Sequence, residues 1–389
     1  MAFLPFALPD IGYEEINEVI DTLESGWITT GPKIMKFEKA FSEYIGSKYS
    51  ISVNSATAGL HLALDAIGLE RDDLVITSPY TFTATAEVIR YFDAHPVFCD
   101  INEKTFNIDV QKLEDLLKKL CAGKNHKVKA IMPVHFAGQT CDMNEIMSLA
   151  QKYNLKIIED AAHSLPATCN NKMIGTIGDI TVFSFYATKS ITTGEGGMIT
   201  TNNEAYKDKM SKMRLHGINK DSWDRYVSPE ASWSYDIIGA GYKYNMTDIA
   251  ASIGLQQLKK CDYFFEKRNK IAERYTESFK NLNRIETPFV KNKNDKHSWH
   301  LYVIKVKNKM RDKFISIMKE KEVGCSVHFI PLHIQTYWKE KYSLKPDDFP
   351  VAYSCFCEAV SLPAYAKMPE SDIEKVIQAV IETHNKIFS

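Results

Sequence analysis

A single lysine in a strand-to-turn segment is the residue from which chemistry is most readily inferred. Lys189 follows an apolar, β-branched and aromatic run at 180–185 and precedes a turn rich in glycine, at 194–197. The run predicts a buried strand, and the glycines allow the backbone to pass close to a bulky ligand. Ligands of α/β proteins bind at strand ends. The segment therefore suits a Schiff base between Lys189 and an aldehyde, although a surface lysine before an ordinary turn fits the same local pattern.

Two acids and a histidine follow another apolar segment, at 155–158. A carboxylate at a buried strand end is costly unless a cation pairs with it. Asp160 is the candidate for this carboxylate, and a protonated ring nitrogen would be a suitable partner. His163 fits either a ligand contact or a buried histidine with satisfied hydrogen bonds. His135, which follows the apolar run at 130–134, has the same structural interpretation and is left unassigned.

Candidates for holding an anion and a planar ring follow two other predicted strands. Ala56 and Thr57 come shortly after the strand at 51–53 and open a helix, where backbone amides, hydroxyls and the helix dipole attract an anion. A simple helix cap explains the same residues. Phe82 follows the strand at 74–77 and has an aromatic face that suits a planar ligand, with core packing as the alternative.

One chemistry needs all of these parts together. A Schiff-base lysine, a phosphate pocket at a helix start, a stacking aromatic ring and a carboxylate opposite a pyridinium nitrogen are the groups that pyridoxal phosphate requires of a protein. The residues therefore predict an enzyme that uses pyridoxal phosphate.

The elements that must position these residues alternate between strands and helices. Strands are predicted at 51–53, 74–77, 96–99, 130–134, 155–158 and 180–185, and helices at 12–23, 34–44, 58–67, 83–92, 110–120 and 143–153. This alternation predicts an α/β fold with a mostly parallel central sheet and helices on both faces. Functional residues should gather at the carboxyl ends of the strands.

The pattern changes beyond about residue 281. Strands at 301–306 and 324–329 and helices at 310–319 and 371–384 predict a smaller C-terminal α+β domain. We place the large cofactor-binding domain, with its N-terminal helices, at 1–255. The small domain is then 256–389.

Composition limits the class of protein. The 389 residues include 48 basic and 49 acidic ones, so the net charge of −1 gives no strong field that would attract nucleic acid or a membrane surface. Eight scattered cysteines without a C-x-x-C pair argue against a metal site and a disulfide framework. No leader pattern and no run of about 18 apolar residues is present. We therefore expect a cytoplasmic protein with no metal, no nucleic-acid partner and no membrane partner.

The ordered set of motifs resembles the DegT/StrS family of pyridoxal-phosphate-dependent nucleotide-sugar aminotransferases, which have the aspartate-aminotransferase fold, also called fold type I. The resemblance covers essentially the entire chain. It is carried by segments at 25–27, 31–32, 54–58, 81–82, 133–135, 159–163, 183–197 and 215–217.

The resemblance implies a role for each candidate. Catalysis would fall to Lys189, which forms the Schiff base, and Asp160, which keeps the ring nitrogen protonated. The other cofactor contacts would be Phe82 on the ring, His163 near the phenolic oxygen, and Ala56, Thr57 and Ser184 on the phosphate. Asn245 would reach the phosphate held by a neighbouring subunit, which implies a homodimer with shared active sites. Helix capping is the other interpretation of Asn245.

The resemblance also implies the substrates. An amino group would pass from L-glutamate to a nucleotide-linked keto sugar, with C4 favoured over C3, in the biosynthesis of amino sugars for surface polysaccharide. The residues assigned to the substrate are Trp27, Thr29, Trp299, His328 and His333. Packing between domains explains the last three equally well.

Two other functions remain open. The first is a pyridoxal phosphate enzyme that dehydrates sugars, but relatives that deoxygenate sugars replace the lysine with histidine, and Lys189 argues against this function. The second is a catalytically silent regulatory protein of the same fold. The intact set of Asp160, Lys189 and Asn245 disfavours it.

Overall fold

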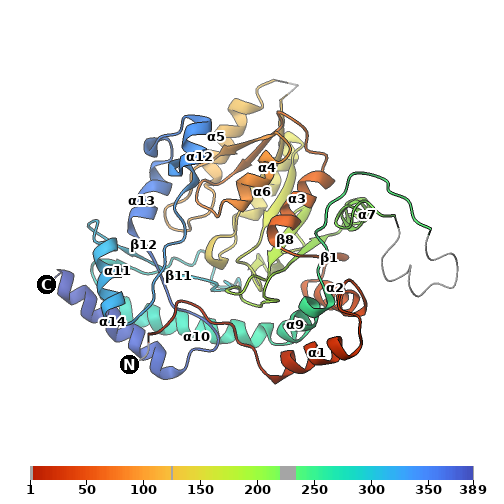
Figure 1. The fold of residues 1–389 in the computed structure, drawn as a ribbon. Coiled ribbons are helices and arrows are strands. Elements are labelled where there is room, and N and C mark those ends of the chain that lie inside the picture. Colours follow the sequence, from red (N-terminus) through yellow and green to blue (C-terminus); the bar gives the residue numbers. More distant parts are fainter. Residues whose placement is uncertain (1–2, 124–125, 220–233, 389) are drawn as a thin grey trace.

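The structure is a computed structural model that describes residues 3–123, 126–219 and 234–388. A seven-stranded sheet lies at its centre, and a three-stranded sheet lies toward the side where both termini are found (Figure 1). No helix in the described part of the chain is both long enough and apolar enough to cross a bilayer.

Strands and α-helices alternate along the chain from α2 to β5, and β5 to β9 then follow one another without an intervening helix. The strands are β1 (Tyr49–Val53), β2 (Leu74–Thr77), β3 (His95–Phe98), β4 (Val128–Met132), β5 (Lys156–Asp160), β6 (Thr168–Cys169), β7 (Lys172–Met173), β8 (Ile180–Ser184), β9 (Gly197–Thr201), β10 (Ile285–Glu286), β11 (Tyr302–Val306) and β12 (Ala359–Leu362). The α-helices are α1 (Tyr13–Glu24), α2 (Pro32–Ile45), α3 (Ala56–Ala66), α4 (Ala84–Arg90), α5 (Val110–Leu120), α6 (Met143–Tyr153), α7 (Glu204–Met213), α9 (Asp248–Lys259), α10 (Cys261–Phe279), α11 (Arg311–Glu320), α12 (Thr336–Tyr342), α13 (Pro350–Glu358) and α14 (Glu370–Phe388).

The central sheet is mostly parallel, as predicted. Its order is β1-β9-β8-β5-β4-β2-β3. The strands from β8 to β3 pair in parallel, whereas β9 runs antiparallel to both β8 and β1. The carboxyl ends of all strands except β9 therefore meet at one edge, where the loops that follow them can build a common site.

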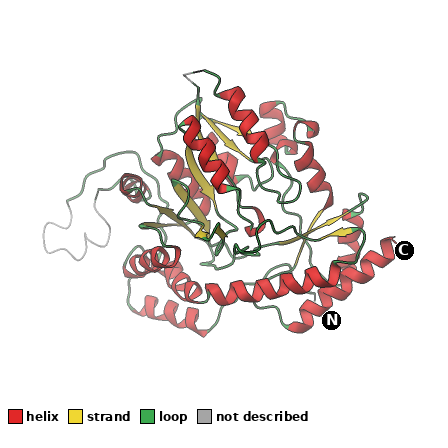
Figure 2. Cartoon of the chain, turned by 180° about the vertical axis from the view of Figure 1, so that it is seen from behind, coloured by secondary structure: helices red, strands yellow, loops and turns green. Residues whose placement is uncertain are grey.

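Helices cover both faces of this sheet (Figure 2). One core packs the helices α2, α5, α6 and α9 against strand residues that include Ile157 and Phe183. The other core packs α3, α4 and α7 against residues that include Ile158 and Val182. Successive side chains of a strand point to opposite faces. Glu159 and Asp160, the last residues of β5, therefore point into different layers.

A third core lies in the C-terminal region. Buried residues of α10, α11, α14, β11 and β12 form it, among them Tyr275, Phe314 and Val376. The predicted strand at 324–329 is wrong. Only Ser326 makes a bridge there, to Ser361 of β12, because the chain then turns toward the cavity that His328 lines. We keep the division at 255/256 as a proposal, and this boundary falls within α9.

Candidate active site

A cavity of about 470 Å³ opens at the carboxyl edge of the central sheet. Loops that follow β1, β2, β4, β5 and β8 line it, together with the start of the chain and two segments from the C-terminal region. The predicted site residues that it brings together are Ala56, Thr57, Phe82, Asp160, His163, Ser184, Lys189 and His328.

Lys189 lies in the turn that follows β8, where its backbone N–H donates to the Tyr186 carbonyl oxygen at 2.9 Å. Its side chain is half-buried and lines the cavity. Burial lowers the pKa of the Lys189 amine from 10.5 to about 8, and the negative charge of Asp160 opposes this shift. At pH 7 about a tenth of the molecules then carry a free amine, which an ordinary lysine would almost never do. The residue is therefore suited to attack a carbonyl carbon.

Asp160 is a buried carboxylate whose hydrogen-bond donors, in the part of the chain that the structure describes, are all neutral groups. The Thr85 hydroxyl donates to Oδ2 at 2.7 Å, and the Ala162 N–H donates to Oδ1 at 3.2 Å. Because Thr85 uses its single proton here, the Thr81 hydroxyl, 2.8 Å away, must donate to Thr85. Burial raises the pKa of Asp160, although these hydrogen bonds and the Lys189 charge oppose it. The carboxylate thus lacks the cation that a pyridinium N–H would provide.

The phosphate end of the cavity forms where α3 begins. The Ser55 side chain accepts the Ala58 N–H at 3.1 Å and caps the helix. Gly197 pairs with Ser184 across β8 and β9, and a Cβ at Gly197 would lie only 2.8 Å from the Ala56 nitrogen. The glycine therefore allows the strand pair to touch the helix start. This contact puts the Ser184 hydroxyl beside the amides that attract an anion.

Aromatic rings border the rest of the cavity. Phe82 is 60% exposed, so one face of its ring is free to cover a planar ligand. The His163 ring lies 4.3 Å from that of His300, and its Nδ1 accepts the Ala137 N–H at 3.2 Å. Burial lowers the pKa of His163 well below its usual value, with a further contribution from the Lys189 charge. Burial also lowers the pKa of His328 to about 4. These histidines are neutral at physiological pH.

A second cavity, of about 400 Å³, contains three other predicted site residues. Trp27, Thr29 and Asn245 line it. Among the described residues, none lines both this cavity and the one around Lys189. The Asn245 side chain donates to the Thr30 hydroxyl at 2.7 Å and to the Met246 carbonyl oxygen at 3.3 Å. Within one chain, Asn245 is therefore not part of the Lys189 cavity.

Comparison with known proteins gives a family to which this geometry belongs. A model of the DegT/DnrJ/EryC1/StrS aminotransferase family matches residues 9–381. The chain belongs to this family. It is 52% identical over 383 residues to the protein MJ1066 of Methanocaldococcus jannaschii, with 97% of each chain covered. It is 47% identical to the spore coat polysaccharide biosynthesis protein SpsC of Bacillus subtilis, with 97% of this chain and 96% of that relative covered.

A solved structure agrees with the family assignment. The putative sugar aminotransferase Spr1654 from Streptococcus pneumoniae, in its PMP form, superposes with a TM-score of 0.92 at 33% identity, covering 99% of this chain and 100% of the other. The predictions of fold type I and of an aminotransferase are confirmed. Aminotransferases of the DegT/DnrJ/EryC1/StrS family work with pyridoxal phosphate, which also confirms the predicted cofactor. The residues of the cavity fit this group, since its unpaired carboxylate, its nucleophilic amine and its anion pocket face one space.

Two residues assigned to the substrate lie away from the cavity of this family member. Trp299 stacks on His297, with ring centroids 3.9 Å apart, and its Nε1 donates to Asn269 at 3.0 Å. His333 is fully buried, and its ring centroid lies 5.1 Å from that of Phe349. Neither residue lines the Lys189 cavity, because each side chain packs between elements.

Other cavity residues escaped the sequence analysis. His300 and Phe329 line the cavity beside His163, and Phe6 reaches it from the start of the chain. Thr85 supports Asp160 from α4. Thr81 precedes α4 whereas Thr85 lies in its first turn, so no regular helical spacing indicated that their hydroxyls would meet. No local signal pointed to Phe6, since only tertiary packing places it there.

Proposed function

We propose that this aminotransferase acts on sugars, moving an amino group from L-glutamate to a nucleotide-linked keto sugar, with C4 favoured over C3. The observation that carries the proposal is the single cavity lined by Lys189, Asp160 and the start of α3. The name of the SpsC relative supports a place in polysaccharide biosynthesis. The cytoplasm remains the predicted location.

The residues of the chain divide the chemistry between them. Pyridoxal phosphate, when bound, supplies an aldehyde carbon and an electron-withdrawing ring. Asp160 keeps a proton on the ring nitrogen, and Thr81 and Thr85 orient that carboxylate. The Lys189 amine takes a proton from the α-carbon of the amino donor and later returns a proton as a general acid. Phe82 covers the cavity and helps to keep water out.

The competing functions are less well supported. A sugar dehydratase of this fold would be expected to lack the lysine, whereas Lys189 lines the cavity with a lowered pKa. A silent regulatory protein would not need a half-buried amine next to an unpaired carboxylate. Both groups are costly to bury, and catalysis is the function that gives them a purpose.

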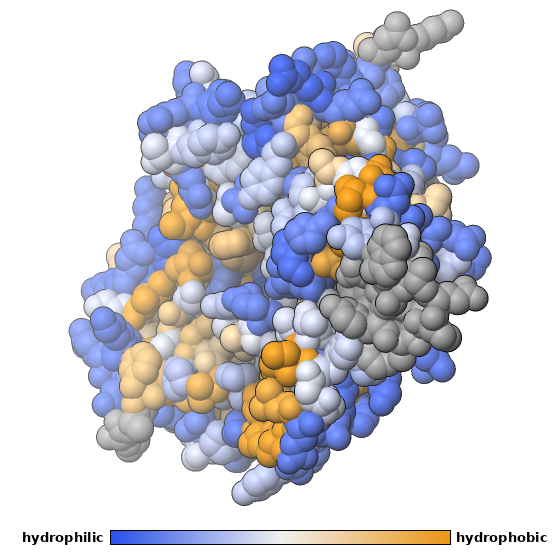
Figure 3. Space-filling model, turned by 45° about the vertical axis from the view of Figure 1, so that its right-hand side comes forward, coloured by the Kyte–Doolittle hydropathy of each residue, from blue (hydrophilic) through white to orange (hydrophobic). Residues whose placement is uncertain are grey.

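We also propose that the active unit is a homodimer in which Asn245 completes the site of the neighbouring subunit. Trp27, Thr29 and Asn245 share a cavity that is separate from the Lys189 cavity of their own chain, which supports a role in the other subunit. The α1 helix exposes four apolar side chains at helical spacing, Tyr13, Ile16, Ile20 and Leu23. The space-filling view of this side of the molecule shows apolar residues gathered in exposed patches (Figure 3). Such patches are common where another subunit packs.

Subunit complementation tests the shared site. Asn245→Ala should weaken cofactor binding by about ten- to a hundredfold, because one hydrogen bond to a charged phosphate contributes roughly 1.5–3 kcal/mol. Mixed Lys189→Ala and Asn245→Ala chains should form heterodimers with one intact site and regain activity at limiting cofactor. The structure gives the capping role to Thr247, whose side chain accepts the Ala250 N–H at the start of α9. Verified heterodimers without recovery, or a fully active monomer, would therefore assign Asn245 to its own chain, where its side chain donates to Thr30.

A substrate screen tests the sugar assignment. The protein is loaded with pyridoxamine phosphate, and nucleotide-linked 4-keto and 3-keto hexoses are offered one at a time. We expect a glutamate-regenerated cycle that yields an amino sugar from a 4-keto compound, detected by mass spectrometry. Amination of free keto acids alone would contradict the sugar assignment, and release of a dehydrated sugar would support the elimination enzyme.

A further inference from the structure

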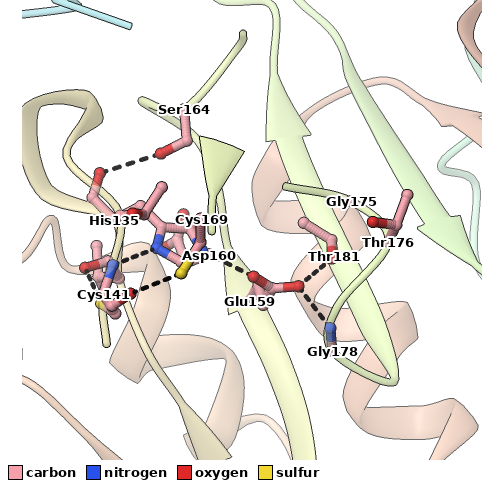
Figure 4. A network of polar contacts seen from close by, with 12 residues as sticks. His135, Cys141, Glu159, Asp160, Ser164, Cys169, Gly175, Thr176, Gly178 and Thr181 are labelled. Carbon is pink, nitrogen blue, oxygen red and sulfur yellow. Dashed lines mark hydrogen bonds and ion pairs between the residues drawn. The ribbon is translucent and has the colours of Figure 1, made fainter. Parts of the chain in front are cut away.

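A second buried carboxylate lies directly behind Asp160, on the other face of β5 (Figure 4). Glu159 and His135 are both fully buried, and Glu159 Oε2 lies 2.9 Å from His135 Nε2. The other carboxylate oxygen, Oε1, accepts the Gly178 N–H at 2.8 Å and the Thr181 hydroxyl at 2.7 Å. Both carboxylate oxygens of Glu159 therefore accept hydrogen bonds from within the chain.

The contacts of His135 fix its tautomer. The Cys141 N–H donates to Nδ1 at 3.0 Å, so this nitrogen carries a lone pair. The proton of a neutral imidazole then lies on Nε2, which donates it to Glu159. An imidazolium would present a second N–H to the Cys141 amide. The pair is thus a carboxylate with a neutral histidine, locked in one orientation.

His135 also closes the turn that follows β4. Its backbone N–H donates to the Asp160 carbonyl oxygen at 3.1 Å, its carbonyl oxygen accepts the Ser164 hydroxyl at 3.3 Å, and its imidazole holds the amide of Cys141. Between these anchors lies Ala137, in the left-handed region with φ of 57°. This conformation is rare for a residue with a Cβ, so the surrounding bonds must maintain it.

The 136–138 turn, held in this position, determines the tautomer of His163. The Ala137 N–H donates to His163 Nδ1 at 3.2 Å, which leaves the ring proton on Nε2. His163 lines the cavity, so Nε2 is the nitrogen available to a ligand. A neutral N–H donor suits an oxygen acceptor such as the phenolic oxygen predicted beside it.

We propose that Glu159 and His135 are positioning residues of the active site, which hold the 136–138 turn from the far face of β5 and so fix His163 as an Nε2–H donor to the cavity. The inference rests on the proposed aminotransferase function for its catalytic meaning. The tautomers of His135 and His163 are properties of the protein without substrate, so they can be measured in its absence.

A further residue also supports the turn. The Asn107 side chain accepts the Phe136 N–H at 2.8 Å and donates to the Gln139 carbonyl oxygen at 2.8 Å. Loss of the Glu159 contact should therefore loosen the turn without dismantling it. Variants of Glu159 are for this reason suitable for measurement in the folded protein.

The first measurement needs no variant. Nitrogen-15 NMR of wild-type apoprotein with labelled histidine and backbone should show an unprotonated Nδ1 in His135 and in His163, with couplings across the hydrogen bonds to the Cys141 and Ala137 amides. A His163 protonated at Nδ1, or one that titrates near pH 6.5, would overturn the proposal. Because no sugar or amino donor is present, this result does not depend on the substrate assignment.

The second measurement compares Glu159→Gln with Thr181→Val. In Glu159→Gln, the side-chain NH2 either faces the His135 Nε2–H, donor against donor, or replaces the oxygen that accepts from Gly178 and Thr181. Thr181→Val removes one hydrogen bond to the same carboxylate and leaves the contact between Glu159 and His135 intact. We expect Glu159→Gln to give mixed His163 tautomers and about tenfold weaker cofactor binding, the loss of roughly one hydrogen bond. Thr181→Val should lower only Tm. Equal losses of Tm with an unchanged His163 signal in both variants would show a merely structural role.

Discussion

Two adjacent carboxylates at the end of β5 have opposite environments. Glu159 accepts three hydrogen bonds from His135, Gly178 and Thr181, all within the chain. Asp160 accepts two from neutral donors and faces the cavity without an ion-pair contact among the described residues. The comparison indicates that Glu159 finds its partners inside the protein. Asp160, to which we assign the catalytic role, would instead depend on a partner that binds in the cavity.

Other residues on the two faces of the central sheet show the same difference between unsatisfied and satisfied polar groups. On the cavity side, burial lowers the pKa of Lys189 to about 8 and that of His300 well below its usual value. His300 Nδ1 is also buried without a hydrogen-bond partner among the described residues. On the far side, both nitrogens of His135 have partners. The cavity therefore holds groups in states that cost stability, which is typical of a catalytic site.

The largest expected effect comes from Lys189→Ala. The variant should lose multiple turnover by a factor of at least about 10⁴, because the amine is both the nucleophile and the general base. It should still bind the cofactor, since the anion pocket and Phe82 are unchanged. Steady-state transamination and equilibrium dialysis with cofactor check the two halves of this prediction. Near-normal turnover would remove Lys189 from its assigned role.

The next effect distinguishes the two carboxylates directly. Asp160→Asn should reduce turnover by about 10²–10³-fold, the usual size of a lost electrostatic contribution in an active site. Glu159→Gln should reduce turnover far less but lower the free energy of unfolding by about 1–3 kcal/mol, as expected for a disturbed buried hydrogen-bond pair. Parallel measurements of kcat and urea unfolding check the crossed pattern. If the two variants lost turnover and unfolding free energy to the same extent, the two carboxylates would not differ in function as we infer.

This pair also shows how far sequence alone can lead. The predicted alternation of strands and helices put Asp160, Ser184 and Thr57 near strand ends, and the structure brings all three to one cavity. The predicted strand at 155–158 stops short of β5, which continues to Asp160. Alternation along a strand implied that Glu159 and Asp160 point to opposite faces, but it could not say which face carries the cavity.

Local sequence patterns could not predict contacts between segments that are distant in the chain. His300 and Phe6 line the cavity because the C-terminal region and the start of the chain fold back over the sheet edge. Trp299, the neighbour of His300, points away with φ of 50°. Which of two adjacent side chains enters a cavity is set by tertiary packing in such irregular segments, where no period of two or 3.6 applies.

The third prediction concerns the stability cost of the cavity face. Lys189→Met should raise the free energy of unfolding of the apoprotein at pH 7 by up to about 3 kcal/mol, because each tenfold change in proton affinity corresponds to about 1.4 kcal/mol. The folded state binds fewer protons than the unfolded state between about pH 8 and 10.5, so the wild-type deficit should shrink as pH rises through this window. Denaturant unfolding at pH 7 and pH 10 measures it. The exposed Lys172→Met is the control, for which no gain is expected; an equal gain there would point to a general charge effect.

The smallest expected effect is a shift in the pH at which Lys189 becomes reactive. Covalent attachment of pyridoxal phosphate to the apoprotein requires the free amine, so its rate should rise about tenfold per pH unit below pH 8 and level off above it. Asp160 is the charge that raises the pKa of Lys189, whereas Glu159 makes no such contribution. Asp160→Asn should therefore move the midpoint to lower pH, and Glu159→Gln should leave it in place. Stopped-flow absorbance with cofactor in excess gives the midpoints. A wild-type midpoint near pH 10.5 would contradict the lowered pKa of Lys189. The two variants remove charges from neighbouring positions on the same strand, so they differ only in the face of the sheet on which the charge lies. Equal shifts in both variants would therefore contradict the inference that Asp160 is coupled to the cavity and that the sheet insulates Glu159 from it.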